Sequence, residues 1–462
     1  MKSIVLLSIL GVVSMFAGIF NYRKLILPII LLGIATAIGL LFDQWDMNKH
    51  YFNDMAVFDN YAIAFSALIL AVSFLIFVLA MYHYRDADPH SVTDIYALFI
   101  FALTGGVLLT SYNNLAMLFL GVEILSIPLY VLAGSRRNDL ASNEAALKYF
   151  LMGAFATGFL LFGIALVYGA TGSFALDGIA AYVSNHDMSA IPAFFYVGII
   201  FLIVALLFKV SAAPFHFWAP DVYQGSPVLV TAFMSTVVKI SAFAAFLRLF
   251  VTCFASLKEY YEIILIIAAI FTLLIGNITA IYQQSVKRML AYSGISHAGY
   301  LLIAIVVMGT SASSVIFYYS AAYAGASIIA FAVLTAIMEN KDGRESFEAF
   351  KGLGKNNPLL AFSMSVAMLS LAGIPPLAGF FGKYYLFTTA MQDGYMWLVL
   401  IAVFNSLISL YYYFRVILLM YSAAEEEVPA FKNHYGLIAT IAIALAISLG
   451  IGFAPDLLLG LL

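Results

Sequence analysis

The stretch VLVTAFMSTVVKISAFAAFLRLF, residues 228–250, is long and apolar enough to cross a membrane, yet it carries a lysine near its centre. Membrane-spanning helices are runs of about 17–25 mostly apolar residues. An ionised side chain inside hydrocarbon costs roughly 2.5–3.5 kcal/mol even on lenient insertion scales, and such residues usually mark the path of an ion or a proton. Lys239 therefore indicates a chain that moves charge through a membrane.

Three more ionisable residues lie within apolar runs. Glu123 stands in LAMLFLGVEILSIPLYVLAG (residues 115–134), while Lys209 and Lys383 lie close to proline-rich interruptions of their runs. Burial disfavours the charged form of a lysine and so weakens its hold on the proton, and a nearby carboxylate restores it. Arginine would stay charged, so lysine suits a switchable proton site. The alternatives are a structural ion pair for Glu123 or Lys239, and snorkelling to the interface for Lys209 or Lys383.

Two histidines, His216 and His297, are expected at membrane depth. A neutral imidazole has two different nitrogens and can relay a proton, and the alternative is a hydrogen-bonded packing role. We interpret Lys148 as an interfacial anchor at the start of a helix near residue 149. The 69 phenylalanine and tyrosine residues are interpreted as lipid-facing and interfacial material rather than as a cofactor site.

Composition places the chain in a lipid environment. Of its 462 residues, 64% are hydrophobic and 10% are charged, whereas soluble domains carry about 25% charged residues. One cysteine excludes a disulfide framework or a Cys-ligated cluster within the chain, and the sequence contains no phosphate-binding loop, CxxC or HExxH motif. A net charge of −3 without a basic tail argues against nucleic acid. The first twenty residues are interpreted as an uncleaved span rather than a signal peptide.

The apolar runs predict an all-α polytopic membrane protein with about fourteen transmembrane helices. We place them at residues 3–20, 25–42, 61–82, 95–110, 115–134, 149–168, 193–215, 228–250, 263–282, 290–308, 313–338, 359–391, 397–420 and 436–453. Cytoplasmic loops are enriched in Lys and Arg. With the hairpin at residues 21–24 taken as cytoplasmic, 14 of the 21 basic residues fall on that side. Both termini are then expected on the non-cytoplasmic side.

Two of the predicted spans should be interrupted. The seventh runs into Pro214, Pro220 and Pro227. The twelfth contains GIPP at residues 373–376, and its 33 residues would make a helix of roughly 50 Å, too long for a hydrocarbon core of ~30 Å. An internal proline removes a backbone donor and clashes with the preceding turn. Breaks of this kind persist in membranes only where other helices or a wet cavity satisfy the freed backbone groups.

The two broken spans lie five apart and therefore cross the membrane in opposite directions. This geometry predicts two inverted five-helix repeats, residues 94–250 and 262–421, each with one broken helix, a common plan among transporters. Flanking helices in residues 1–83 and 436–462 complete a single membrane-embedded domain.

Three stretches together resemble the antiporter-like membrane subunits of respiratory complex I. They are FKVSAAPFHFWAPDVYQGSPVLVTAFMSTVVKI (residues 208–240), QQSVKRMLAYSGISHAGYLL (283–302) and LSLAGIPPLAGFFGKYYLF (369–387). Within this family, DVYQGSP at 221–227 and the lysine at 383 favour one subunit type over a sister type, in which a carboxylate would be expected at position 383. The similarity extends over nearly the whole chain.

The resemblance implies one proton-translocating unit of fourteen helices in a membrane arm. By motif, Glu123 and Lys209 match a glutamate–lysine pair, Lys239 matches a central lysine, and Lys383 matches the lysine of the twelfth span. His216 and His297 match polar-axis positions with less certain roles. The resemblance also implies that this chain binds no cofactor, and that NADH, FMN, iron–sulfur clusters and quinone belong to partner subunits in a bacterial inner membrane. Neighbouring antiporter-like and small membrane subunits are the expected partners.

Three other functions stay open at the level of sequence. A sodium/proton antiporter subunit of the Mrp type would share these motifs and work without quinone chemistry. A subunit of a hydrogenase-linked pump would use hydrogen or formate as its electron donor. A structural membrane anchor would keep the buried charges only to pair them.

Overall fold

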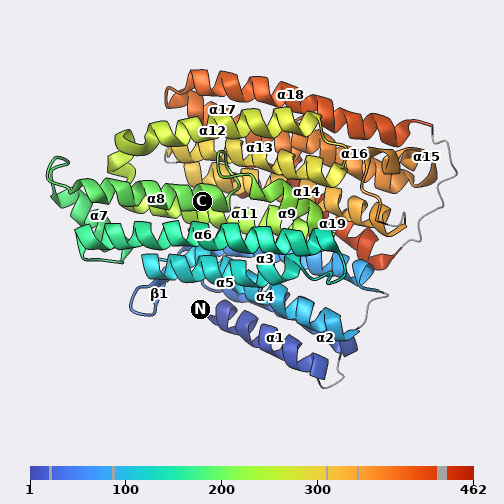
Figure 1. Ribbon diagram of the computed structural model, residues 1–462, viewed down its shortest axis with the longest axis horizontal. Helices are drawn as coiled ribbons and strands as arrows, with labels where there is room; N and C mark the ends of the chain where they lie inside the picture. The colour runs from blue at the N-terminus through green and yellow to red at the C-terminus, as the bar shows by residue number, and fades with distance from the viewer. Residues whose placement is uncertain (20–22, 86–88, 309–310, 341–342, 424–433) are drawn as a thin grey trace.

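The computed structural model describes residues 1–19, 23–85, 89–308, 311–340, 343–423 and 434–462. The chain forms a bundle of roughly parallel helices, in which α1 and α2 lie at one edge and α17 and α18 at the opposite edge (Figure 1). Lys341 and Lys432, both predicted to be cytoplasmic, lie outside the described residues, as do the side chains of Arg23 and Lys24.

The helices in the first half of the chain are α1 (Lys2–Ile19), α2 (Arg23–Phe42), α3 (Asn60–His83), α4 (Pro89–Ser111), α5 (Leu115–Ala133), α6 (Leu140–Thr171), α7 (Leu176–Asn185), α8 (Ala193–Lys209), α9 (Trp218–Gly225), α10 (Val228–Phe233), the π-helical turn η1 (Met234–Val238) and α11 (Lys239–Cys253). Those in the second half are the 3₁₀ turn η2 (Ala255–Leu257), α12 (Lys258–Ile281), α13 (Val286–Val307), α14 (Ala312–Asn340), the 3₁₀ turn η3 (Phe347–Phe350), α15 (Leu353–Asn356), α16 (Pro358–Ala372), α17 (Ala378–Gln392), α18 (Met396–Tyr421), α19 (Tyr435–Phe453) and α20 (Asp456–Leu459).

The predicted number of membrane crossings is confirmed. In the described residues, eleven apolar stretches are long enough to cross a membrane, and one of them, Val228–Ile281, contains two crossings, α10–α11 and α12. Two further crossings are each built from two shorter helices, α8 with α9 and α16 with α17. This gives fourteen.

Both predicted breaks are present. Helix α8 ends at Lys209, and an irregular segment at residues 210–217 leads into α9. Helix α16 ends at Ala372, and residues 373–377 lead into α17. The structure gives helices throughout both predicted repeats, and the repeat boundaries at 94–250 and 262–421 stay a prediction.

Three predicted helix starts are too late by five residues or more. Helices α4 and α12 begin at Pro89 and Lys258, six and five residues before the predicted starts, and α6 differs most. Helix α6 begins at Leu140, nine residues before the predicted start, because the Asp139 carboxylate accepts a hydrogen bond from the backbone N–H of Ala141 and caps the helix. Lys148 consequently lies within the third turn of α6 and not at its beginning.

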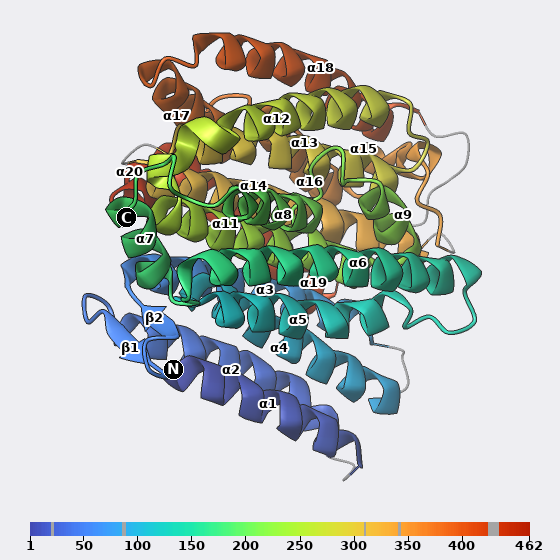
Figure 2. The ribbon, with the colours of Figure 1, turned by 60° about the vertical axis from the view of Figure 1, so that its left-hand side comes forward.

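The two ends of the bundle differ in character. The strands β1 (Lys49–Tyr51) and β2 (Ala56–Phe58) form a small antiparallel hairpin that lies with α7, α20 and both chain termini at one end (Figure 2). Backbone bridges join Ala56 to Tyr112 and Asn114 to Ala175 at this end. We call it the terminal end, and the other the loop end.

The centre of the bundle is formed by α13 and α14. In α14, every residue of an apolar 18-residue stretch is buried, and in α13, 94% of the corresponding stretch is buried. Helix α19 returns from the far edge and packs between α3 and α14. Polar side chains on α13 and α14 therefore face protein rather than lipid.

Candidate functional site

Lys209 and Glu123, matched by motif to a glutamate–lysine pair, each bind a separate hydroxyl group in the structure. The buried Lys209 ammonium donates a hydrogen bond to Ser126 Oγ at 2.5 Å. The Glu123 carboxylate accepts one from Thr157 Oγ1 at 2.7 Å. No ion pair joins the two charges in the described part of the chain; the ammonium binds Ser126, one turn after Glu123 on α5, and the carboxylate binds Thr157.

A small cavity lies beside Lys209 and Thr157. Its volume is about 20 Å³, and its lining includes Ser126, Tyr130, Thr157 and Lys209. A cavity of this size holds about one water molecule, which needs two to four polar partners. Lys209 and Thr157, the residue bonded to Glu123, thus face a common space.

Lys239 lies at the junction of the π-helical turn η1 and α11. Single π-helical turns inside α-helices are frequent at functional sites. The Lys239 side chain is 3% exposed, and its ammonium donates to the backbone carbonyl of Gly294 at 2.5 Å. A Cβ on Gly294 would lie 3.0 Å from both Lys239 Nζ and the Tyr323 hydroxyl, so the glycine permits this close approach.

Lys383 points into the protein at the second break and does not snorkel. Its ammonium donates to the Ala372 carbonyl and to Ser406 Oγ, both at 2.9 Å, and lies 4.9 Å above the Tyr300 ring. Ala372 ends α16, so its carbonyl is one of those that a helix terminus leaves without an intrahelical partner. The break thus supplies the acceptor for this lysine.

His297 lies in a buried hydrogen-bonded cluster. Its Nδ1 is 2.7 Å from the Tyr319 hydroxyl, and its Nε2 is 3.2 Å from that of Tyr413. The Tyr413 hydroxyl also lies 2.5 Å from Ser293 Oγ. Ser293 precedes Gly294, the acceptor of Lys239, so this cluster reaches the backbone beside that lysine.

His216 is not brought to the other candidates. It lies in the first break, is 4% exposed, and stacks near Phe217 with ring centroids 4.4 Å apart. Its Nδ1 has no hydrogen-bond partner among the described residues. No hydrogen bond in that part of the chain connects it to the three lysines.

Several tyrosines contradict their interpretation as lipid-facing. Tyr300, Tyr319, Tyr323, Tyr412 and Tyr413 are all buried around His297 and Lys383. The sequence held a signal for them on α13. Residues 293, 297 and 300 carry Ser, His and Tyr at spacings of four and three, which places three polar side chains on one helix face. Two asparagines were also missed, since Asn277 accepts from the Tyr412 hydroxyl at 2.9 Å and donates to Asn405 at 3.3 Å.

A second polar cluster lies at the loop end. Asp221 on α9 accepts hydrogen bonds from Lys148 and Arg288, both at 2.8 Å. Lys287, 1% exposed, donates to the carbonyls of Gln224 and Ser226 at 2.8 and 2.5 Å. Both halves of the chain contribute to an open cavity of about 400 Å³ here, which is lined by Lys148, Asp221, Gln224, Lys287 and Arg288 among others. Lys148 is thus an anchor, but its partners lie on α6 and α9 rather than in the lipid headgroups.

Within the described residues, no three His, Cys, Asp or Glu side chains come together in a way that could hold a metal ion. The buried Cys253 thiol contacts the Leu176 carbonyl at 3.5 Å.

Comparison with known proteins places this fold in a family. The family model described as NADH:quinone oxidoreductase/Mrp antiporter, TM, matches residues 112–409. An NADH-quinone oxidoreductase subunit N from Cytophaga hutchinsonii is 47% identical over 461 residues, 99% of each chain. A chain of respiratory complex I from Thermus thermophilus is 34% identical with a TM-score of 0.83, and the match covers 99% of this chain and 98% of that one.

A chain of the Mrp complex from Dietzia sp. DQ12-45-1b shares the fold with a TM-score of 0.84, at 21% identity, over 100% of this chain and 96% of that one. The fold and the buried lysines define an antiporter-like membrane subunit. The chain belongs to the NADH:quinone oxidoreductase/Mrp antiporter family, and within it to the N subunits of NADH-quinone oxidoreductase.

Proposed function

We propose that this chain is a proton-translocating subunit of the membrane arm of complex I, and that Lys209, Lys239 and Lys383 carry the proton. One observation supports this most strongly. Each of the three buried ammonium groups is bonded to neutral oxygens, and none of them forms an ion pair among the described residues. A buried lysine held by neutral acceptors can release its proton without leaving a carboxylate uncompensated.

The cluster around His297 is the proposed link between Lys239 and Lys383. Ser293, Tyr413, His297 and Tyr319 form a continuous series of hydrogen bonds next to the Gly294 carbonyl that holds Lys239. Hydroxyl and imidazole groups both donate and accept, so a proton can pass along such a series by exchange of bonds. Lys383 lies against Tyr300, a neighbour of His297 on α13.

Glu123 is the proposed control element. When its carboxylate and the Lys209 ammonium approach each other, Lys209 binds its proton more strongly, and Lys239 experiences a changed field. A change of ~1.4 kcal/mol alters proton affinity tenfold. Moving one charge against the membrane potential costs ~2.3 kcal/mol per 100 mV. Two or three tenfold changes in the proton affinity of a lysine therefore suffice to load and unload a proton.

We place proton uptake at the loop end and release at the terminal end. The excess of basic residues supports a cytoplasmic loop end, with both termini on the opposite side of the bacterial inner membrane. The open, charged cavity around Asp221 gives water access at the loop end. Lys383 lies on α17, which leads from the break to the terminal end.

The energy for transport comes from electron transfer in partner subunits. In this proposal the chain is part of a translocase, and the NADH, FMN, iron–sulfur and quinone sites belong to the partners. The neighbouring antiporter-like and small membrane subunits transmit the charge movement to Glu123. The relatives that are NADH-quinone oxidoreductase N subunits support this assignment over an antiporter that works alone.

The test is NADH-driven proton uptake by inverted membrane vesicles that carry Lys239→Ala, with assembly checked on a native gel. Lys258→Ala is a matched control, because Lys258 also donates to a backbone carbonyl, that of Val307 at 3.0 Å, but lies at the terminal end. We expect assembled complex with lost uptake for Lys239→Ala and normal uptake for the control. Unchanged uptake by assembled Lys239→Ala complex would refute the pathway and favour the anchor function. Repeating the assay without sodium separates proton from sodium transport.

A further inference from the structure

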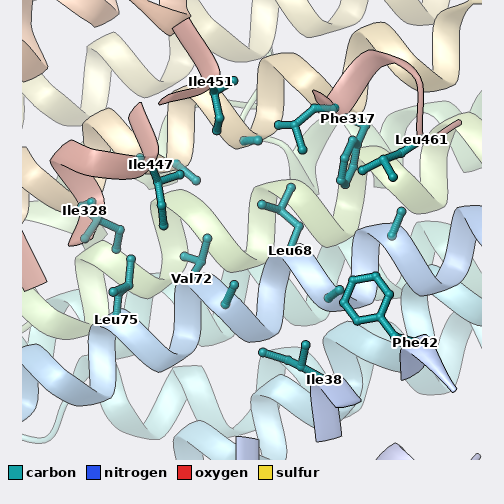
Figure 3. A pocket seen from close by; sticks show the side chains of 18 of the residues that line it. Ile38, Phe42, Leu68, Val72, Leu75, Phe317, Ile328, Ile447, Ile451 and Leu461 are labelled. Carbon is teal, nitrogen blue, oxygen red and sulfur yellow. The ribbon is translucent and has the colours of Figure 1, made fainter. Parts of the chain in front are cut away.

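An apolar cavity whose lining includes none of the lysines runs along the bundle between α2, α3, α14 and α19 (Figure 3). Its volume is about 270 Å³, and no charged or hydroxyl side chain lines it. It is open on one side, since Phe42 and Ile447 at its rim are 52% and 41% exposed. The cavity is therefore accessible from the surface of the subunit at membrane depth.

The cavity is a column parallel to the helices. On α3 its lining extends from Ala64 to Leu75, and on α14 from Phe317 to Ile328. Eleven residues of helix rise roughly 16 Å, which is about half of a ~30 Å hydrocarbon core. The column thus has the length of one leaflet of the bilayer.

One end of the column lies at the terminal end of the bundle. Trp45, just after α2, lines the column there, and its ring stacks on Phe42 with centroids 6.0 Å apart. Tryptophan is enriched at the membrane–water interface. The last residues of the chain, Leu458 and Leu461, line the same end, whereas Leu75 and Ile328 lie at the deep end (Figure 3).

Small residues on three helices keep the column open. Ala67 and Ala71 on α3, Ala324 and Gly325 on α14, and Ala444 on α19 line it. Gly325 is not needed for close helix packing, because a Cβ there would meet only Ser448 Cβ at an ordinary 3.7 Å. The side of α3 at Ala71 is exposed although most of the helix is buried.

We propose that this column is a binding site for one acyl chain of a membrane phospholipid from the leaflet at the terminal end. An apolar void forfeits the dispersion contacts of its lining, and water gains no polar partners there. The medium at this depth is the hydrocarbon of lipid tails, and a single chain matches the column in length and polarity. The headgroup then lies beside Trp45, and the methyl end near Leu75.

The test uses the assembled complex in nanodiscs with phospholipids that carry a diazirine on one acyl chain, either close to the glycerol or close to the methyl end. After illumination, labelled residues are mapped by peptide mass spectrometry. We expect the first probe to label around Phe42 and Ala64, and the second to label around Leu75 and Ile328. This order of depth requires a chain that lies in the column.

Ala71→Phe fills the column from its exposed side, and Ala442→Phe is the matched control, since Ala442 is exposed on α19 but does not line the column. We expect Ala71→Phe to reduce labelling of Leu75 and Ile328 to the level of the unilluminated sample, and Ala442→Phe to leave it unchanged. Absence of labelling in the wild-type column, as when a partner helix fills it, overturns the proposal. Labelling without depth order, or labelling displaced by an added quinone, also overturns it. The wild-type depth order decides the question even if the variant fails to assemble.

Discussion

Lys239 donates its hydrogen bond to the backbone carbonyl of Gly294, and no carboxylate lies within ion-pairing distance of its ammonium in the described residues. A carbonyl acceptor stabilises the charged form less than a carboxylate does. It also stays in place when the proton leaves, because it belongs to helix α13.

This arrangement predicts that Lys239→Arg assembles but does not pump. Arginine keeps its charge under all physiological conditions, so it cannot release a proton at this position. NADH-driven proton uptake should fall to the level of Lys239→Ala, whereas Lys258→Arg should behave as the wild type. Pumping by an assembled Lys239→Arg complex would mean that this residue need not lose its proton.

Ser126 should matter for transport through Lys209. Ser126→Ala removes the hydroxyl that accepts from the ammonium, and leaving a buried charged donor unsatisfied costs about 1–3 kcal/mol. A barrier higher by about 1.4 kcal/mol lowers a rate about tenfold, so the initial rate of proton uptake should fall by about that factor. Ser142→Ala is the control, because Ser142 donates to the Ala133 carbonyl at 2.7 Å away from any lysine. Equal rates in the two variants would contradict the role of Ser126.

Tyr413 should be needed and its neighbour Tyr412 much less so. Tyr413→Phe removes the hydroxyl that joins Ser293 to His297, while Tyr412→Phe removes a bond to Asn277 of similar strength. Each loss destabilises the fold by about 1 kcal/mol. Tyr413→Phe loses two hydrogen bonds and Tyr412→Phe one, so thermal unfolding should shift about twice as far in Tyr413→Phe, and only Tyr413→Phe should slow pumping. A common decrease in pumping would show that the cluster is structural.

Gly373 and Gly394 have the same kind of backbone conformation, but only Gly373 lies against Lys383. Both have a positive φ, +87° and +88°, so an alanine at either costs about 1–3 kcal/mol of backbone strain. A Cβ at Gly373 would also lie 2.9 Å from Lys383 Cδ, whereas Gly394 has open space. We expect similar losses of thermal stability and a loss of proton uptake only for Gly373→Ala. Normal uptake by this variant would show that the position of Lys383 is not critical.

Much of the architecture could be predicted from sequence because the membrane restricts the choices. An apolar run must be a helix, since its backbone groups find no water, and Pro214 and the GIPP segment could only interrupt one. The burial of Lys239 and Lys383 followed from the same runs. The start of α6 could not be found from hydropathy, because Asp139 and the polar first turns it caps carry no apolar signal.

The hydrogen-bond acceptors of the lysines could not be predicted from the sequence. Which oxygen receives the Lys209 ammonium depends on the relative position of α5 and α8, and Glu123 and Ser126 lie one turn apart on α5. Gly294 is an acceptor through its backbone, which every residue possesses, so nothing in its identity indicated this role. The tyrosines around His297 looked like interfacial residues because composition does not reveal which face of a helix is covered.

Two lysine contacts lie two turns apart on helix α13. Lys287, near its start, binds the carbonyls that end α9, and Gly294, two turns later on the same face, receives Lys239. The segment from α9 through η1 to Lys239 is thus hydrogen-bonded to helix α13 at both of its ends. Between these two contacts the chain is helical except at the Ser226–Pro227 junction, and its winding changes in the π-helical turn that ends one residue before Lys239. A displacement of α9 at the charged surface therefore reaches the central ammonium through these two irregular points.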